Sequence, residues 1–138
     1  MGLFSGIDLV RVILAAVASM AVGFLWYSDF LFAKPWKKAM GISEKMLKKQ
    51  KDSGMGQKFA IAFICSIISS YVIDIFIFVL GITSPYGAMQ LSFWVWLGFF
   101  ATSDISVYLW QGKPFELYVL NTMQNLAALM AIGLVLTF

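Results

Sequence analysis

Four long apolar segments constrain this chain more than any other feature of its sequence. They cover residues 7–33, 59–80, 86–110 and 115–138, and polar or turn-forming stretches separate them. A transmembrane helix needs about 20 predominantly apolar residues, so each segment is long enough to cross a bilayer. Lipid also requires every backbone polar group to be satisfied within the protein, which a helix achieves by itself. We therefore predict an all-α membrane protein with four transmembrane helices.

The composition narrows the possible chemistry. Hydrophobic residues make up 61% of the chain and charged residues 12%, against about 45–50% and 25% in soluble domains. The sequence has no histidine and a single cysteine, Cys65, so it lacks the usual haem and zinc ligands, a histidine general base and an internal disulfide. We predict one transmembrane domain over residues 1–138 and favour a non-enzymatic protein without a cofactor or a metal.

Basic residues concentrate in one loop and set the expected orientation. Eight of the ten Lys and Arg residues lie in the loop 34–58, and Lys113 follows the third segment. The positive-inside rule places both regions in the cytoplasm, so both termini face outward from the inner membrane. We expect this loop to contact anionic lipid headgroups rather than nucleic acid. Because the other connections are short, neighbouring helices form an antiparallel bundle.

The basic loop has its own helix signals. Ser43 is typical of an N-cap, Glu44 of an acidic first turn and Gly54 of a helix end. Between them lie four lysines and an adjacent pair of apolar residues, which give the segment a charged and an apolar side. This pattern predicts a short interfacial helix on the cytoplasmic headgroups. Pro35 restricts the residue before it and predicts the end of the first span at about Ala33. We expect that span to be a retained helix rather than a signal peptide, because no basic residue precedes it.

Ionisable and amide side chains inside spans are costly and are candidates for function. At a rise of 1.5 Å per residue they fall into two layers. Arg11 and Asp74 lie roughly 6 to 9 Å from the outer ends of their helices and are expected to form a structural ion pair. The inner layer contains the candidate ligand or ion residues Asp29, Asp104, Asn121, Gln124 and Asn125.

The inner layer has two interpretations. In the first, Asp29 and Asp104 face one another beside Asn121 and share a proton or a cation. In the second, each acid is tied separately, Asp29 to Lys34 and Asp104 to serine hydroxyls of its own helix, and the layer only fixes helix register. The aromatic cluster at Trp94 and Trp96 also has two interpretations, a flat apolar ligand such as a quinone or ordinary core packing.

The stretch Trp26-Tyr27-Ser28-Asp29-Phe30-Leu31-Phe32-Ala33-Lys34-Pro35-Trp36 resembles a motif of a known family. That family consists of small bacterial and archaeal four-helix membrane proteins and is catalogued only as a domain of unknown function. Met40-Gly41, Gly98-Phe99 and Asn121 match the family in later segments. The chain departs from the motif at Asp29, where the family usually has proline, and at Ala33, where it has glycine. The resemblance implies the four-helix topology and implies no activity.

The sequence thus supports three hypotheses for function. The leading one is a self-associating, homo-oligomeric membrane bundle with an ion, proton or small-molecule site in the inner layer. A second is a lipid- or quinone-directed redox enzyme or an accessory subunit of a larger complex, which would purify with an extractable cofactor. A third is an adaptor that binds a larger membrane partner through the basic loop and loses it on Lys to Glu exchange.

Overall fold

A computed structural model describes residues 7–51 and 54–138, and all regular structure in those residues is helical. Three helices are long and apolar enough to cross a membrane, namely α1 (Leu9–Trp26), α4 (Met55–Val79) and α8 (Phe115–Thr137). The others are α2 (Ala33–Met40), α3 (Glu44–Lys51), α5 (Pro85–Val95), the π-helix η1 (Trp96–Ala101), α6 (Thr102–Asp104) and α7 (Ser106–Leu109). The prediction of an all-α protein is confirmed for the described residues.

Helix α1 ends at Trp26, whereas the sequence predicted that the first span ends at about Ala33. A turn follows in which the amide of Phe32 donates to the carbonyl of Trp26 and the amide of Ala33 donates to the carbonyl of Ser28. The Ser28 hydroxyl donates to the carbonyl of Leu25 at 2.6 Å. These local bonds satisfy backbone groups that a helix end leaves open, so the chain leaves the helix at little cost.

The basic loop contains two helices where the sequence indicates one. The additional helix, α2, carries Pro35 in its first turn, where the missing amide costs no hydrogen bond. Gly41 ends α2 with a φ of 69°, a conformation that glycine adopts without strain. Helix α3 coincides with the predicted interfacial helix, and the Ser43 hydroxyl accepts from the amide of Met46 at 3.2 Å.

The third predicted span, residues 86–110, is divided into several helical pieces. Pro85 opens α5 and Ser84 caps it. The wider turns of η1 follow, and the Thr102 hydroxyl donates to the carbonyl of Gly98 at 2.7 Å. Because this π-segment and the boundary at Ile105 divide the span into short elements, three rather than four of the described helices meet the length required to cross a membrane as single α-helices.

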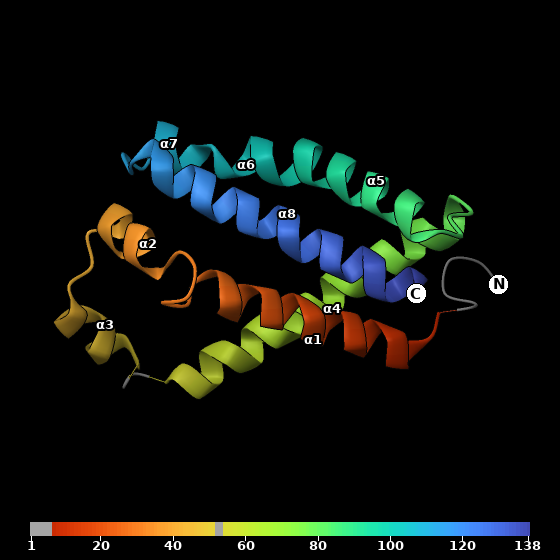
Figure 1. The fold of residues 1–138 in the computed structure, drawn as a ribbon, viewed down its shortest axis with the longest axis horizontal. Coiled ribbons are helices and arrows are strands. Elements are labelled where there is room, and N and C mark those ends of the chain that lie inside the picture. Colours follow the sequence, from red (N-terminus) through yellow and green to blue (C-terminus); the bar gives the residue numbers. More distant parts are fainter. Residues whose placement is uncertain (1–6, 52–53) are drawn as a thin grey trace.

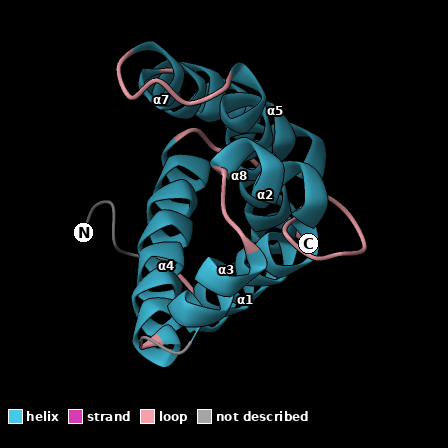
Figure 2. Cartoon of the chain, turned by 90° about the vertical axis from the view of Figure 1, so that its left-hand side faces the viewer, coloured by secondary structure: helices cyan, strands magenta, loops and turns pink. Residues whose placement is uncertain are grey.

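Helix α8 lies at the centre of the packing, with α1 and α5 on its two sides (Figures 1 and 2). Helix α4 packs mainly on α1. The buried core joins α1 to α8 through residues such as Val12, Ala15, Leu129 and Ile132. Helices α2, α3 and α7 lie at one end of the long helices, and the C-terminus lies at the other (Figure 1). The lysine-rich segment is therefore collected at a single end of the molecule.

Glycine allows α5 and α8 to approach closely. A Cβ atom added at Gly133 would lie 2.9 Å from the Ser92 hydroxyl and 3.2 Å from the carbonyl oxygen of Ala88. The buried Ser92 hydroxyl also donates to the carbonyl of Leu129 at 2.9 Å. Small residues and short polar bonds of this kind are typical of helix contacts in membranes, where the hydrophobic effect does not drive helices together.

Candidate functional site

Two asparagines on α8 organise the inner polar layer. Asn121 and Asn125 are four residues apart, so they lie on one face of the helix. The Tyr27 hydroxyl donates to Oδ1 of Asn121 at 2.7 Å, and Nδ2 of Asn125 donates to Oδ2 of Asp104 at 2.8 Å. We call Tyr27, Asp104, Asn121 and Asn125 the amide cluster. It joins the end of α1 and the end of α6 to the middle of α8.

Asp29 lies outside the amide cluster, although the first interpretation of the sequence pairs it with Asp104. Its side chain is 85% exposed, and Oδ1 lies 3.9 Å from Nζ of Lys37. The reason is the early end of α1, which puts Asp29 in the exposed turn instead of on the inner face of a helix. The two carboxylates have different partners, and the exposed position of Asp29 does not fit a shared, poorly solvated proton or cation site. The second interpretation expected Asp104 to bind serine hydroxyls of its own helix. Its hydrogen-bond partner is instead Asn125 of α8.

Tyr27 is the member of the amide cluster that sequence reasoning did not single out as a site residue. It directly follows α1 and is half-buried. Burial, and secondarily the negative charge of Asp104, raise the pKa of Tyr27 to about 12. The phenol is protonated at neutral pH with or without this shift, and it acts as a hydrogen-bond donor to Asn121. The sequence feature that could have identified Tyr27 as a site residue is its position in the Trp26-to-Trp36 motif. The indole of Trp26 donates to the carbonyl of Leu120 at 3.1 Å and fixes this end of α1 on α8.

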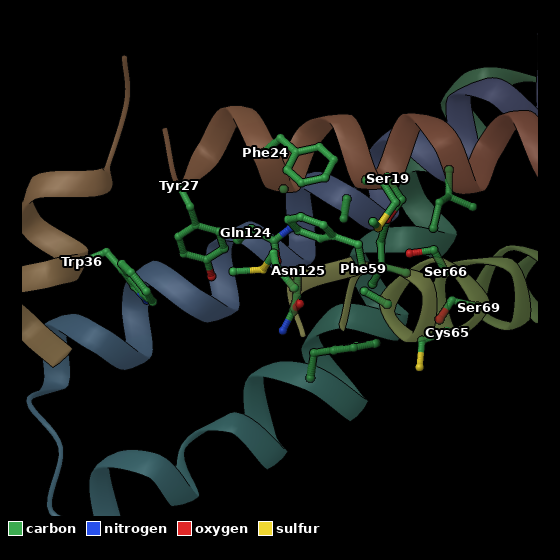
Figure 3. Close-up of a pocket in the computed structure, with 18 residues that line it drawn as sticks. Ser19, Phe24, Tyr27, Trp36, Phe59, Cys65, Ser66, Ser69, Gln124 and Asn125 are labelled. Atoms are coloured by element: carbon green, nitrogen blue, oxygen red, sulfur yellow. The ribbon is translucent and has the colours of Figure 1, made fainter. Parts of the chain in front are cut away.

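A cavity of about 600 Å³ lies beside the amide cluster, between α1, α4, α8 and η1 (Figure 3). We call it the central cavity. Gln124 and Asn125 contribute amides to its wall, and Ser19, Ser66 and Ser69 contribute hydroxyls. The complete lining is Ser19, Met20, Gly23, Phe24, Tyr27, Trp36, Met55, Phe59, Ala62, Cys65, Ser66, Ser69, Phe100, Gln124, Asn125, Ala128, Leu129 and Ile132.

Aromatic rings line one end and the middle of the central cavity. Tyr27 and Trp36 stand next to each other with ring centroids 5.5 Å apart, and Phe24 meets Phe59 edge to face at 5.2 Å. Figure 3 shows Tyr27 and Trp36 at one end and the α4 residues Cys65, Ser66 and Ser69 toward the other. Trp36 comes from α2, so the unpredicted helix of the basic loop supplies part of the wall. The cavity is largely apolar and has its hydrogen-bonding groups at a few defined positions.

In the outer layer, Arg11 and Asp74 lie near each other but do not form the expected ion pair. Arg11 and Asp74 line the same hollow of about 320 Å³, near the C-terminal end of α8. The guanidinium of Arg11 donates to the carbonyl of Leu136 at 3.3 Å. Both ion pairs within 4.0 Å in the described part of the chain involve Lys37, with Asp29 and with Glu44. Arg11 and Asp74 thus share a hollow without direct contact between their charged groups.

The two tryptophans of the aromatic cluster have different surroundings. The indole of Trp96 donates to the carbonyl oxygen of Thr122 at 2.6 Å, which ties η1 to α8. Trp94 is 64% exposed and packs edge to face on Phe93. Neither tryptophan lines the central cavity, where η1 contributes Phe100 instead. No group of three or more metal-ligating side chains occurs among residues 7–51 and 54–138.

These features define the class of protein: a small all-helical membrane protein with a mostly apolar cavity between its long helices. The chain belongs to the family described as "Protein of unknown function (DUF1761)", whose model matches residues 10–137. The resemblance inferred from the Trp26-to-Trp36 motif is thereby confirmed. No curated protein and no solved structure matches the chain.

Proposed function

We propose that this protein is a non-enzymatic membrane protein that binds an amphipathic small molecule in the central cavity. The observation that carries the proposal is the cavity itself. Its volume of about 600 Å³ lies within the range of about 300 to 1,000 Å³ of small-molecule sites, which are typically apolar with a few placed polar groups. The amides of Gln124 and Asn125 can orient a polar head, and the apolar walls of α1 and α4 can hold a tail.

The position of the cavity along the helices supports a ligand drawn from the membrane. Cys65 lies ten residues into α4, which corresponds to about 15 Å along the helix axis. The lining continues to Ser69, fourteen residues into α4 and about 21 Å along its axis. The cavity thus extends from the lysine-rich end, where Trp36 lies, to somewhat beyond the middle of the roughly 30 Å hydrocarbon core. An amphipathic molecule in the inner leaflet has its head and tail at these same depths.

The proposal includes four crossings, with α5, η1, α6 and α7 together forming the third. At the junctions, Trp96 and Ile105 both have right-handed helical dihedral angles, so the pieces follow one another as a continuous, distorted helix. The crossings alternate in direction as an antiparallel bundle. Both termini lie outside the inner membrane, and the loop 34–58 binds anionic headgroups inside.

Self-association completes the proposal. Ile61, Ile64, Ile68 and Val72 form an exposed apolar stripe on α4, which packs mainly on α1 in the described structure. A second copy can cover this stripe by close packing in lipid. Particle mass in a mild detergent tests this part, and a strict monomer at all protein concentrations would contradict it.

Photolabelling tests ligand binding directly. A fatty alcohol carrying a diazirine on its chain would be irradiated with the purified protein in nanodiscs, and the labelled residues mapped by mass spectrometry. We expect labels on cavity-lining residues of α1, α4 and α8. Ser66→Phe, which fills the cavity, should reduce this labelling about tenfold, equivalent to about 1.4 kcal/mol.

The matched control is Ser103→Phe, which adds the same ring at an exposed position on α6. It should leave the labelling of cavity residues unchanged. Labels confined to the lipid-facing stripe of α4, or equal labelling in the two variants, would contradict the proposed site.

A further inference from the structure

The strongest clue to the chemistry of the occupant is the carboxylate of Asp104. Its Oδ2 accepts a hydrogen bond from the neutral amide of Asn125, and no Lys or Arg in the described residues lies within 4.0 Å of it. An acidic group in a membrane segment is expensive and is usually paired with a cation or placed on an ion or ligand path. The described part of the protein supplies Asp104 with a hydrogen bond but with no nearby positive charge.

The aromatic end of the central cavity adds a second, independent observation. Tyr27 and Trp36 line the cavity with ring centroids 5.5 Å apart and planes inclined by 58°, so they present two differently oriented faces. Phe24, Phe59 and Phe100 contribute further rings to the lining. Clustered aromatic faces attract cations placed within about 6 Å of a ring centroid and are the usual recognition surface for quaternary ammonium groups.

The two features are connected through the amide cluster. Asn125 is part of the cavity lining, and its amide nitrogen donates a hydrogen bond to Asp104. Tyr27 likewise lines the cavity, and the Asp104 charge contributes to the raised pKa of its phenol. The negative charge therefore acts on the same end of the cavity where the aromatic faces gather. In a poorly solvated site such a charge is weakly screened.

We propose that the occupant of the central cavity carries a cationic head, a quaternary or protonated amine on an apolar chain. This inference rests on the proposed function and specifies its ligand class. The cation lies against the faces of Tyr27 and Trp36, and the charge of Asp104 balances it. The apolar chain of the ligand extends along α1 and α4 past Ser19 and Ser66. Such a group occurs both on free cationic amphiphiles and on choline lipids.

The test uses three probes with the same diazirine chain and different heads: trimethylammonium, alcohol and sulfate. In nanodiscs without choline lipids, we expect cavity labelling to reach half-saturation at an about tenfold lower concentration for trimethylammonium than for alcohol. A tenfold preference corresponds to about 1.4 kcal/mol and is the size expected of a cation–π contact with a nearby charge. The sulfate probe should label the cavity least.

Asp104→Asn keeps an acceptor oxygen for Asn125 and removes the charge. It should reduce the ratio of trimethylammonium to alcohol labelling from about tenfold to about threefold, because the charge is lost while the aromatic faces remain, and this ratio corrects for any loss of folded protein. Asp29→Asn, which removes an exposed carboxylate, is the matched control and should leave the ratio at about tenfold. A ratio that stays at about tenfold in Asp104→Asn, or no preference in the wild type, would overturn the inference.

The outcomes separate this inference from the proposed function. Equal cavity labelling by the alcohol and trimethylammonium probes would reject the cationic head and keep the amphiphile site. Absence of cavity labelling by every probe would reject both. Adding phosphatidylcholine to the nanodiscs distinguishes the two sources of the head group: competition identifies a choline lipid, and unchanged trimethylammonium labelling identifies a free amphiphile.

Discussion

At the scale of single residues, the contact between Tyr27 and Asn121 holds the end of α1 on α8. Both side chains are half-buried, and their bond is 2.7 Å long. We expect Tyr27→Phe and Asn121→Ala each to lower the free energy of unfolding, because each leaves the other partner without its hydrogen bond. Their coupling in a double-mutant cycle should be about 0.6 to 1.7 kcal/mol, as for other hydrogen bonds between membrane helices. Reversible unfolding in mixed micelles provides the measurement.

A cycle between Asn121→Ala and Tyr118→Phe is the control for this prediction. Tyr118→Phe also removes one hydroxyl, but the Tyr118 hydroxyl donates to the carbonyl of Ala101, at 2.7 Å. The coupling of these two changes should be clearly smaller than that of Tyr27→Phe with Asn121→Ala, because Tyr118 and Asn121 share no hydrogen bond. Equal coupling in the two cycles would show that the Tyr27 to Asn121 bond is not specific.

At the scale of helices, the α5–α8 contact depends on Gly133. An added methyl group there would meet the Ser92 hydroxyl at 2.9 Å and the Ala88 backbone at 3.2 Å, so α5 would have to move away from α8. We expect Gly133→Ala to destabilise the protein by about 1 to 3 kcal/mol, the usual cost of overpacking. Thermal unfolding in detergent, followed by circular dichroism, measures this loss.

Gly98→Ala serves as the comparison, because a Cβ atom at Gly98 meets nothing within 4 Å. This variant should be neutral or slightly more stable, since alanine has the higher helix propensity. If both alanine variants lose the same stability, close helix approach at Gly133 is not the cause.

At the scale of the whole molecule, the distribution of charge predicts the orientation. Lysines gather around α2 and α3, whereas the turn between α4 and α5 carries no charge. In a Cys65→Ala background, Ser84→Cys should react with an impermeant maleimide added outside intact cells, and Ser43→Cys should react only after lysis. Both positions are exposed, so a difference reports the side of the membrane. The reverse labelling pattern would invert the proposed topology.

Local patterns were sufficient for part of this architecture. The apolar segments predicted the helical class, and the charge and capping residues around Ser43 predicted the helix now seen as α3. The spacing of Asn121 and Asn125 placed their side chains on one face, because four residues make about one helical turn. Such properties depend on neighbouring residues along the chain, so a sequence shows them directly.

Tertiary structure decided which polar residues meet. The sequence predicted that Asp29 and Asp104 lie at nearly the same depth along straight helices, but α1 ends at Trp26 and leaves Asp29 exposed. The same turn positions Tyr27 against Asn121, and α2 brings Trp36 to the cavity. The central cavity combines side chains from α1, α2, α4, η1 and α8, far apart in sequence. Its shape follows from where each helix ends and how closely it packs, and these are set by non-local contacts that no local period encodes.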